Sequence, residues 1–146
     1  MERLNLRPDI EALLEFNGYE KLMEIQTMVL PHMRAGENIM AEAPTGSGKT
    51  LAYLLPMLER LNDDKKVKLL IIAPTKELGS QIVTEVRKFT ESVLFLPDAV
   101  GRERQIENLK KKKREILVGM ANRIYELIGL GKIKVNHLQY IVIDEG

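Results

Sequence analysis

Short apolar runs recur along the chain, each bounded by polar or turn-forming residues. They are rich in Ile, Leu and Val and occupy 38–41, 68–73, 115–119 and 140–143, with a weaker fifth run at 92–96. Runs of this length without polar alternation are typical of strands that are buried on both faces, as in a parallel sheet. The pattern therefore predicts four or five short parallel strands.

Between these runs, apolar residues recur every three or four positions, which indicates amphipathic helices. Such stripes lie within 10–14, 22–33, 51–58, 78–89 and 124–128. Pro8 suits the first turn of its helix, whereas Pro31 is expected to kink or end the helix that contains it. Strands that alternate with helices predict an α/β fold, a parallel sheet flanked by helices on both faces, with ligand sites at the carboxyl ends of the strands.

Composition fits one ordinary globular domain. The chain has 146 residues, of which 45% are hydrophobic and 29% are charged, and its formal net charge is +1. The absence of cysteine excludes disulfides and thiolate metal sites. No apolar run reaches the roughly 18 residues of a membrane helix, so we expect a cytoplasmic protein without a membrane partner. The sequence ends directly after its last predicted strand, which suggests a domain that is incomplete at its C-terminus.

A glycine-rich segment follows the first predicted strand and opens a leucine-striped helix. It reads Ala43-Pro44-Thr45-Gly46-Ser47-Gly48-Lys49-Thr50. Glycines let backbone N–H groups turn towards an anion, and the helix N-terminus adds partial positive charge. In this setting Lys49 is expected to reach the β- and γ-phosphates of a nucleoside triphosphate, and the Thr50 hydroxyl to bind Mg²⁺. Ala43 stands where the general pattern has glycine.

The last predicted strand ends in two carboxylates. Asp144 and Glu145 follow the apolar run 140–143. Beside a phosphate loop, an acid at a strand end is the expected second Mg²⁺ ligand, which we assign to Asp144. Glu145 is then the candidate to orient or deprotonate the attacking water.

Four segments taken together resemble the DEAD-box RNA helicase family of superfamily 2. Residues 16–26 resemble its Q motif, 43–50 its motif I, 73–78 its motif Ia, and 142–145 the start of its motif II. The resemblance covers essentially the whole chain in the right order. It implies that residues 1–146 are the N-terminal RecA-like ATP-binding domain, as a fragment, with 1–36 forming the Q-motif helices before the first core strand.

The resemblance also implies roles that periodicity cannot supply. Tyr19 and Gln26 would join the ATP site, with the Gln26 amide reading the adenine edge. The implied contacts to the RNA backbone, which ignore base sequence, come from Pro74, Thr75, Lys76, Gly101 and Arg123. The expected cofactors are ATP and Mg²⁺, and the expected partners are RNA and a second RecA-like domain that this chain lacks, in a monomeric protein.

Several positions depart from the family pattern. Met1 stands where an aromatic residue usually stacks on adenine, and Lys76 replaces an arginine, which exchanges a planar fork for a point charge. Residues 120–123, Met-Ala-Asn-Arg, replace the Thr-Pro-Gly-Arg of motif Ib and keep only Arg123. Residues 100–102 replace a double glycine, and Gly146 replaces the alanine of motif II.

The predicted function is the ATP-binding lobe of an ATP-dependent RNA helicase, with RNA-stimulated ATP hydrolysis coupled to local unwinding in the full-length protein and little activity in this fragment alone. Two alternatives stay open: a nucleotide-binding RNA-interaction module without unwinding activity, and a DNA-directed helicase of the same superfamily. The basic run 110–114 is interpreted as a solvated helix end, because it lies opposite the ligand-bearing end of the sheet.

Overall fold

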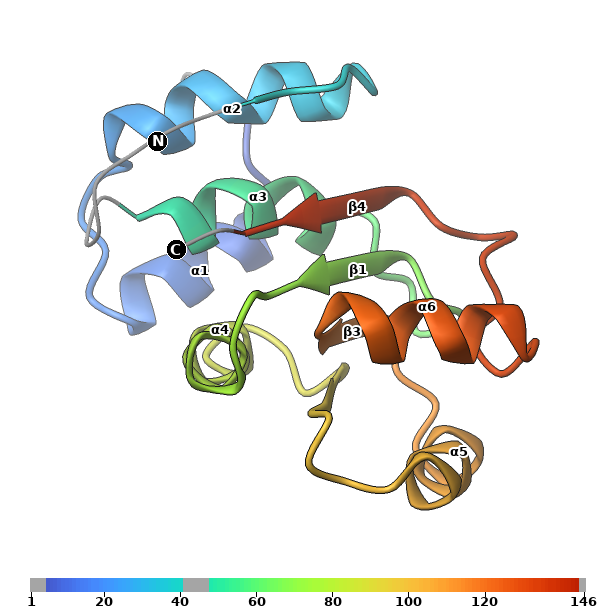
Figure 1. Cartoon of the computed structure of the whole chain (residues 1–146). Coiled ribbons are helices and arrows are strands. Elements are labelled where there is room, and N and C mark those ends of the chain that lie inside the picture. The colour runs from blue at the N-terminus through green and yellow to red at the C-terminus, as the bar shows by residue number, and fades with distance from the viewer. Residues whose placement is uncertain (1–4, 41–47, 145–146) are drawn as a thin grey trace. The chain divides into compact units, whose positions relative to one another are not determined.

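The computed structural model describes residues 5–40 and 48–144. Its internal contacts divide the chain into two compact units, Met1–Arg60 and Leu61–Gly146. The first unit is helical, and the second holds the sheet and its helices (Figure 1). No helix among the described residues is long and apolar enough to cross a membrane.

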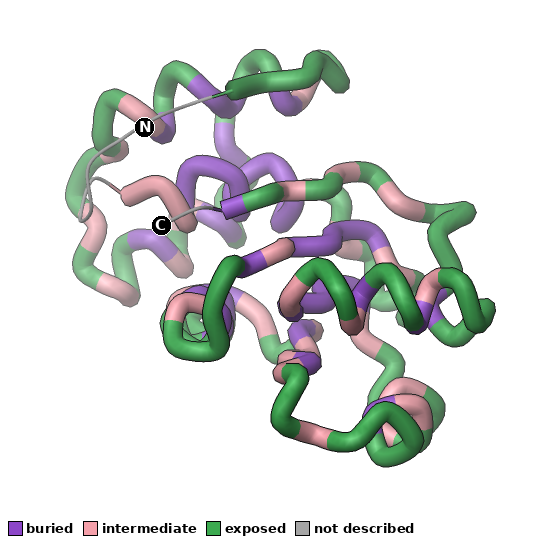
Figure 2. The backbone as a smooth tube through the Cα atoms, viewed as in Figure 1, coloured by how far each residue is buried: buried purple, intermediate pink, exposed green. Residues whose placement is uncertain are grey.

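The first unit contains three helices: α1 (Pro8–Phe16), α2 (Glu24–Arg34) and α3 (Lys49–Leu58). Pro8 opens α1 as predicted, and Ile10 and Leu14 form its buried face. Helix α3 packs against α2 and is buried along almost its whole length (Figure 2). A bidentate ion pair fastens the ends of these two helices, because Arg34 donates to both carboxylate oxygens of Glu59 at 2.9 and 2.7 Å.

One prediction for this unit is wrong, and another is answered in part. Of the two outcomes expected at Pro31, a kink or an end of the helix, the end is not found, because α2 continues through Pro31 to Arg34. The predicted strand at 38–41 is not formed in its described part, residues 38–40, where Met40 is 94% exposed. A strand needs a hydrogen-bonding neighbour, and the backbone of 38–40 has no ladder partner among the described residues.

The second unit is built on four parallel strands: β1 (Leu69–Ile72), β2 (Val93–Leu96), β3 (Ile116–Gly119) and β4 (Tyr140–Ile143). They lie in the order β2-β3-β1-β4, so the two central strands are β3 and β1. Every residue of β3 is buried, as the continuous apolar run predicted. Ile141 and Ile143 of the edge strand β4 are instead 60% and 69% exposed.

Helices cover both faces of this sheet, as predicted. Leu70, Leu96 and Leu117 share one face, where they pack with Ile124 and Leu127 of α6 (Ala121–Gly129). Helix α5 (Arg102–Lys111) adds its apolar side to the same cluster. Helix α4 (Lys76–Arg87) packs against β2 and β3. The ring of Phe95, which alternates with Leu96 and so points to the other face, lies against Gly79 of α4.

The amino ends of the central strands hold a buried ion cluster. Lys68 and Glu115 are 5% and 2% exposed, and their charged atoms lie 3.1 Å apart. The Lys68 ammonium also pairs with the carboxylate of Asp64. Burial lowers the pKa of Lys68, but the hydrogen bonds that its ammonium donates to Asp64 and Glu115 outweigh this effect and raise the pKa above its ordinary value. The hydrogen bond from Lys68 lowers the pKa of Asp64 to about 2.

Candidate functional site

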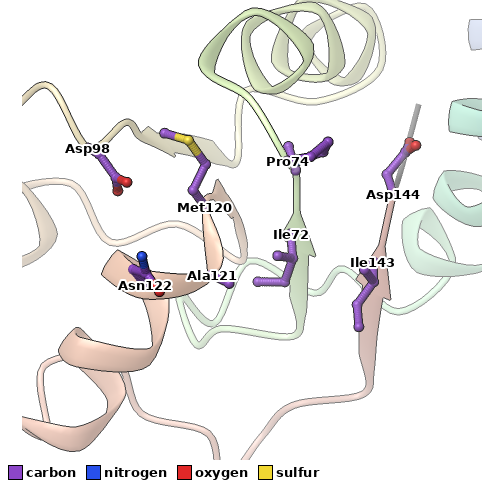
Figure 3. A pocket seen from close by; sticks show the side chains of 9 residues that line it. Ile72, Pro74, Asp98, Met120, Ala121, Asn122, Ile143 and Asp144 are labelled. Atoms are coloured by element: carbon purple, nitrogen blue, oxygen red, sulfur yellow. The ribbon is translucent and has the colours of Figure 1, made fainter.

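A pocket of about 320 Å³ opens at the carboxyl ends of β1, β3 and β4 (Figure 3). This is the end of a parallel sheet at which ligands are expected. Its lining residues are Ile72, Ala73, Pro74, Asp98, Met120, Ala121, Asn122, Ile143 and Asp144. The pocket thus joins segments that lie up to 72 residues apart in the sequence, from Ile72 to Asp144.

Backbone hydrogen bonds bring these strand ends into register. The Ala73 N–H donates to the Gly119 carbonyl at 2.9 Å, and the Asp144 N–H donates to the Ile72 carbonyl at the same distance. Both bonds continue the parallel ladders one residue past the strands. The ladder therefore fixes where the Asp144 carboxylate stands, and this residue is only 7% exposed.

The segment after β1 presents a set of polar groups to solvent. Pro74, Thr75 and Lys76 are all exposed. Thr75 is the N-cap of α4, and its hydroxyl oxygen accepts the Leu78 N–H at 3.1 Å, which satisfies one of the free donors at the helix start. The Thr75 hydroxyl keeps its own hydrogen to donate, so capping the helix and contacting an external acceptor are compatible.

Arg123 is turned towards its own protein. Its Nη1 donates to the Val100 carbonyl at 2.6 Å and to Gln105 Oε1 at 2.5 Å, and its Nη2 donates to the Asp98 carbonyl at 3.4 Å. Its Nε lies 3.3 Å from the Glu126 carboxylate, and the side chain is 15% exposed. The guanidinium therefore ties the start of α6 to the loop between β2 and α5, the loop that carries Gly101.

Gln105 completes this clamp, and the sequence reasoning missed it. It is 1% exposed, accepts from Arg123, and donates through Nε2 to the Pro97 carbonyl at 2.5 Å. The Gln105 side chain thus links the Arg123 guanidinium to the Pro97 carbonyl, at the start of the loop between β2 and α5. The available signal was a polar residue on an apolar helix face, because Gln105 shares its side of α5 with Leu109, four positions later.

In the first unit, the end of the phosphate segment meets the predicted adenine-reading residue. Gly48 is the N-cap of α3 and has a φ of 82°, a left-handed conformation that favours glycine. Its carbonyl accepts from Gln26 Nε2 at 3.2 Å, while Gln26 Oε1 accepts the Met23 N–H at 2.8 Å. A Cβ at Gly48 would overlap the Gln26 amide, which is fully buried. Lys49 and Thr50 follow as the first residues of α3.

The structure thus describes some of the predicted site residues and not others. Asp144 and Pro74 line one pocket, and Gln26 contacts Gly48. Tyr19 lies beyond α1, half-buried, and its N–H donates to the Leu14 carbonyl at 2.9 Å. The predicted residues that lie outside the described part of the chain are Ala43, Pro44, Thr45, Gly46, Ser47 and Glu145, together with Met1 and Gly146. Within the described part, no group of three or more His, Asp or Glu side chains could hold a metal ion.

Comparison with known proteins gives consistent matches over the chain. Residues 23–146 match the family model described as DEAD/DEAH box helicase. The chain is 41% identical to the DEAD-box ATP-dependent RNA helicase CshC of Bacillus cereus, over 97% of this chain and 37% of that protein. It is 37% identical to the probable ATP-dependent RNA helicase YfmL of Bacillus subtilis, over 97% of this chain and 39% of that protein.

A solved structure gives the same answer for the fold. The crystal structure of a DEAD box protein from the hyperthermophile Methanococcus jannaschii matches 99% of this chain and 41% of that one, with a TM-score of 0.88 and 31% sequence identity. The chain therefore spans about two fifths of each of these three relatives.

Proposed function

The chain belongs to the DEAD/DEAH box helicase family, and we propose that it forms the ATP-binding lobe of an ATP-dependent RNA helicase. In the whole protein, RNA stimulates ATP hydrolysis, and hydrolysis is coupled to local separation of an RNA duplex. The observation that carries the nucleotide part is the start of α3, where a left-handed Gly48 leads directly into Lys49 and Thr50. Helix N-termini after such glycine turns favour phosphate.

In this proposal the segment 43–50 cradles the triphosphate, and Lys49 contacts its β- and γ-phosphates. Thr50 supplies a hydroxyl and Asp144 a carboxylate, both hard oxygen ligands of the kind that Mg²⁺ takes. When bound, Mg²⁺ would neutralise charge on the phosphates. Tyr19 and Gln26 contact the adenine, and Gln26 exchanges its bond to the Gly48 carbonyl for one to the base.

Hydrolysis in this scheme is an in-line displacement at the γ-phosphorus. Glu145 orients the water and takes its proton, a bond forms between the water oxygen and phosphorus, and the bond to the β–γ bridging oxygen breaks to release ADP. A second RecA-like lobe in the whole protein supplies the remaining contacts to the phosphates and to RNA. This chain alone is therefore expected to bind ATP weakly and to hydrolyse it slowly.

The RNA contacts are proposed for the exposed loops at the carboxyl end of the sheet. In this proposal the RNA backbone is contacted directly by Pro74, Thr75 and Lys76 after β1, and by Gly101 in the loop after β2. Support comes from their exposure and from the free hydroxyl hydrogen of Thr75. Arg123 acts through the loop that it clamps, because its guanidinium already binds the carbonyls of Val100 and Asp98.

Substitution of the phosphate-loop lysine tests the nucleotide site. We expect Lys49→Ala to lower the affinity of the chain for a fluorescent ATP analogue at least tenfold, because the loss of a charge-assisted phosphate contact costs about 1.5–3 kcal/mol. Arg60→Ala removes an exposed cation from the same unit, outside the segments placed in the nucleotide site, and is the matched control. An affinity for ATP that is the same in both variants would remove this loop from the proposal.

The base-reading role is tested by selectivity. Gln26→Ala should let GTP compete with ATP, since a bidentate amide matches the donor and acceptor of adenine. The change also removes the bond to Gly48, so thermal unfolding of the variant is measured beside nucleotide competition. Retained selectivity for ATP would show that Gln26 holds only the loop.

The use of RNA is tested on the whole protein. Single-stranded RNA should raise its ATPase rate, and DNA should not. Tight ATP binding without RNA stimulation would favour a nucleotide-binding RNA-interaction module that lacks unwinding, an outcome that the replacement of the usual threonine by Met120 allows. Equal stimulation by DNA would favour a DNA-directed helicase.

A further inference from the structure

The amino ends of the strands carry a concentration of positive charge at the opposite end of the sheet from the proposed RNA loops. Four connections reach this end of the second unit, one before each parallel strand, and three of them carry two or more exposed lysines. Lys65 and Lys66 precede β1, Lys110–Lys113 lie where α5 ends before β3, and Lys132 and Lys134 lie between α6 and β4. The run at 110–113 is therefore not an isolated helix end.

Contacts in the core bring these three connections together. Val67, Leu109 and Ile133 each adjoin one group of lysines in the sequence, and all three pack in the same hydrophobic cluster. The backbone adds a second link, because the Lys68 N–H donates to the Glu115 carbonyl at 2.7 Å. Lysines from distant parts of the sequence therefore surround one end of the sheet, the end where β1 and β4 start in Figure 1.

Most of these lysines have no carboxylate partner. Lys65 pairs with Asp63, and Lys111 lies 3.7 Å from Glu107. The remaining six have no ion pair with any residue that the structure describes: Lys66, Lys110, Lys112, Lys113, Lys132 and Lys134.

Two acids at this end of the sheet are paired with Lys68 instead of with the outer lysines. Asp64 and Glu115 both bind the buried ammonium of Lys68. Glu115 also accepts the Asn62 and Asp63 N–H groups, at 3.3 and 2.9 Å. The Glu115 carboxylate, at 2% exposure, is thus removed from solvent, while the partly exposed Asp64 carboxylate is paired with Lys68 and not with any of the six outer lysines.

We propose that this surface, defined as Lys66, Lys110, Lys112, Lys113, Lys132 and Lys134, is a second RNA-binding surface that holds the phosphate backbone. The inference rests on the proposed RNA-dependent function. Flexible ammonium groups suit the phosphates of a polyanion, and they carry no information about base sequence.

The chemistry favours a nucleic acid over a membrane. These lysines lie on helix ends and turns, whereas a membrane-surface helix presents lysines above a free apolar face. The apolar side of α6, with Ile124 and Leu127, is buried against the sheet. The amino-end surface therefore binds RNA that extends beyond the loops at the carboxyl end, and it does so whether or not nucleotide is bound.

The salt dependence of RNA binding tests this proposal. For single strands, the slope of log affinity against log salt concentration changes by about 0.7 for each phosphate contact. Lys112→Gln/Lys132→Gln removes one lysine from each of two connections, so its slope should be shallower by about 1.4. The measurement is fluorescence anisotropy of the chain with two labelled poly-uridine strands. One, of about 10 nucleotides, falls within the roughly 4–16 nucleotides of a compact single-strand site, and the other, of about 30 nucleotides, exceeds it.

Arg7→Gln/Arg104→Gln is the matched control. It removes two exposed cations outside this surface, one before α1 and one in the first turn of α5. We expect the shallower slope for the long strand only, with binding of the short strand and of ATP unchanged. The same slope in both double variants would overturn the proposal, as would loss of binding to phosphatidylserine vesicles without any loss of RNA binding. Failure of the short strand to bind even the unsubstituted chain would instead count against the RNA loops of the proposed function.

Discussion

Replacement of Gln105 by leucine removes the clamp between α6 and the loop after β2 while it keeps the volume of the side chain. The amide of Gln105 makes two hydrogen bonds of 2.5 Å, one to the Pro97 carbonyl and one from Arg123 Nη1. Leucine can make neither. The Pro97 carbonyl keeps only the Val100 N–H, at 3.2 Å, and the guanidinium keeps only its bonds to Val100 and Asp98 and its contact with Glu126.

The structure sets the magnitude of the effect. A polar group left unsatisfied on burial costs about 1–3 kcal/mol, and more when it is charged. Gln105 is 1% exposed, so water cannot readily replace it, but Arg123 retains other acceptors. Because both partners keep other hydrogen bonds, we expect Gln105→Leu to lower the free energy of unfolding by about 1–3 kcal/mol.

Urea unfolding followed by circular dichroism measures this loss. Arg104→Leu is the control, because Arg104 is exposed on the same helix and surface substitutions usually change stability by less than about 0.5 kcal/mol. Arg123→Met and the double variant complete a cycle, in which residues of one network show a coupling of about 0.5–3 kcal/mol. A Gln105→Leu variant as stable as Arg104→Leu, or strictly additive losses in the cycle, would refute the clamp.

Three further changes test other parts of the second unit. Gly119→Ala should cost about 1–3 kcal/mol in urea unfolding, because its Cβ would stand 3.0 Å from the fixed Leu96 carbonyl, and equal stability to the native chain would contradict that packing. Gly129→Ala, in open space at the end of α6, should be neutral or stabilising by up to about 1 kcal/mol, and a clear loss would show a contact that the structure lacks. The pKa of Asp64 is lowered to about 2 in the folded state, so its carboxylate stabilises the native chain above about pH 4, and this stability is lost as the pH falls to about 2. Asp64→Asn should therefore be less stable than the native chain at pH 5, and the difference should shrink towards pH 2. A difference in unfolding free energy that stays constant between pH 5 and pH 2 would exclude this linkage.

Much of the sheet could be predicted from periodicity, because an unbroken apolar run is a direct sign of burial on both faces. The runs that contain β1 to β4 were all identified within one or two residues. The run at 38–41 has the same appearance, yet residues 38–40 form no strand. Hydrophobicity alone does not say whether a pairing neighbour exists, so an apolar run can form a strand or an exposed connection.

The site was predicted less completely, because long-range pairing decides it. Motif order was enough to find Pro74 and Asp144, which meet in one pocket. The contact of Arg123 with RNA stays a prediction, and motif order did not reveal that its guanidinium binds the carbonyls of Val100 and Asp98. Gln105 escaped notice because its partners lie 8 and 18 residues away in the sequence, a separation that no helical or strand period reports.

The bond between Gln26 and the Gly48 carbonyl has a consequence for the order of events at the nucleotide site. The carbonyl belongs to the residue directly before Lys49, so the Gln26 amide that is proposed to recognise the base also restrains the residue next to the proposed phosphate-binding lysine. If Gln26 leaves this carbonyl to meet an adenine, the loop gains freedom at the moment the correct base arrives. A guanine nucleotide would leave that bond in place. Discrimination would then act on the rate at which the triphosphate is engaged as well as on its final affinity.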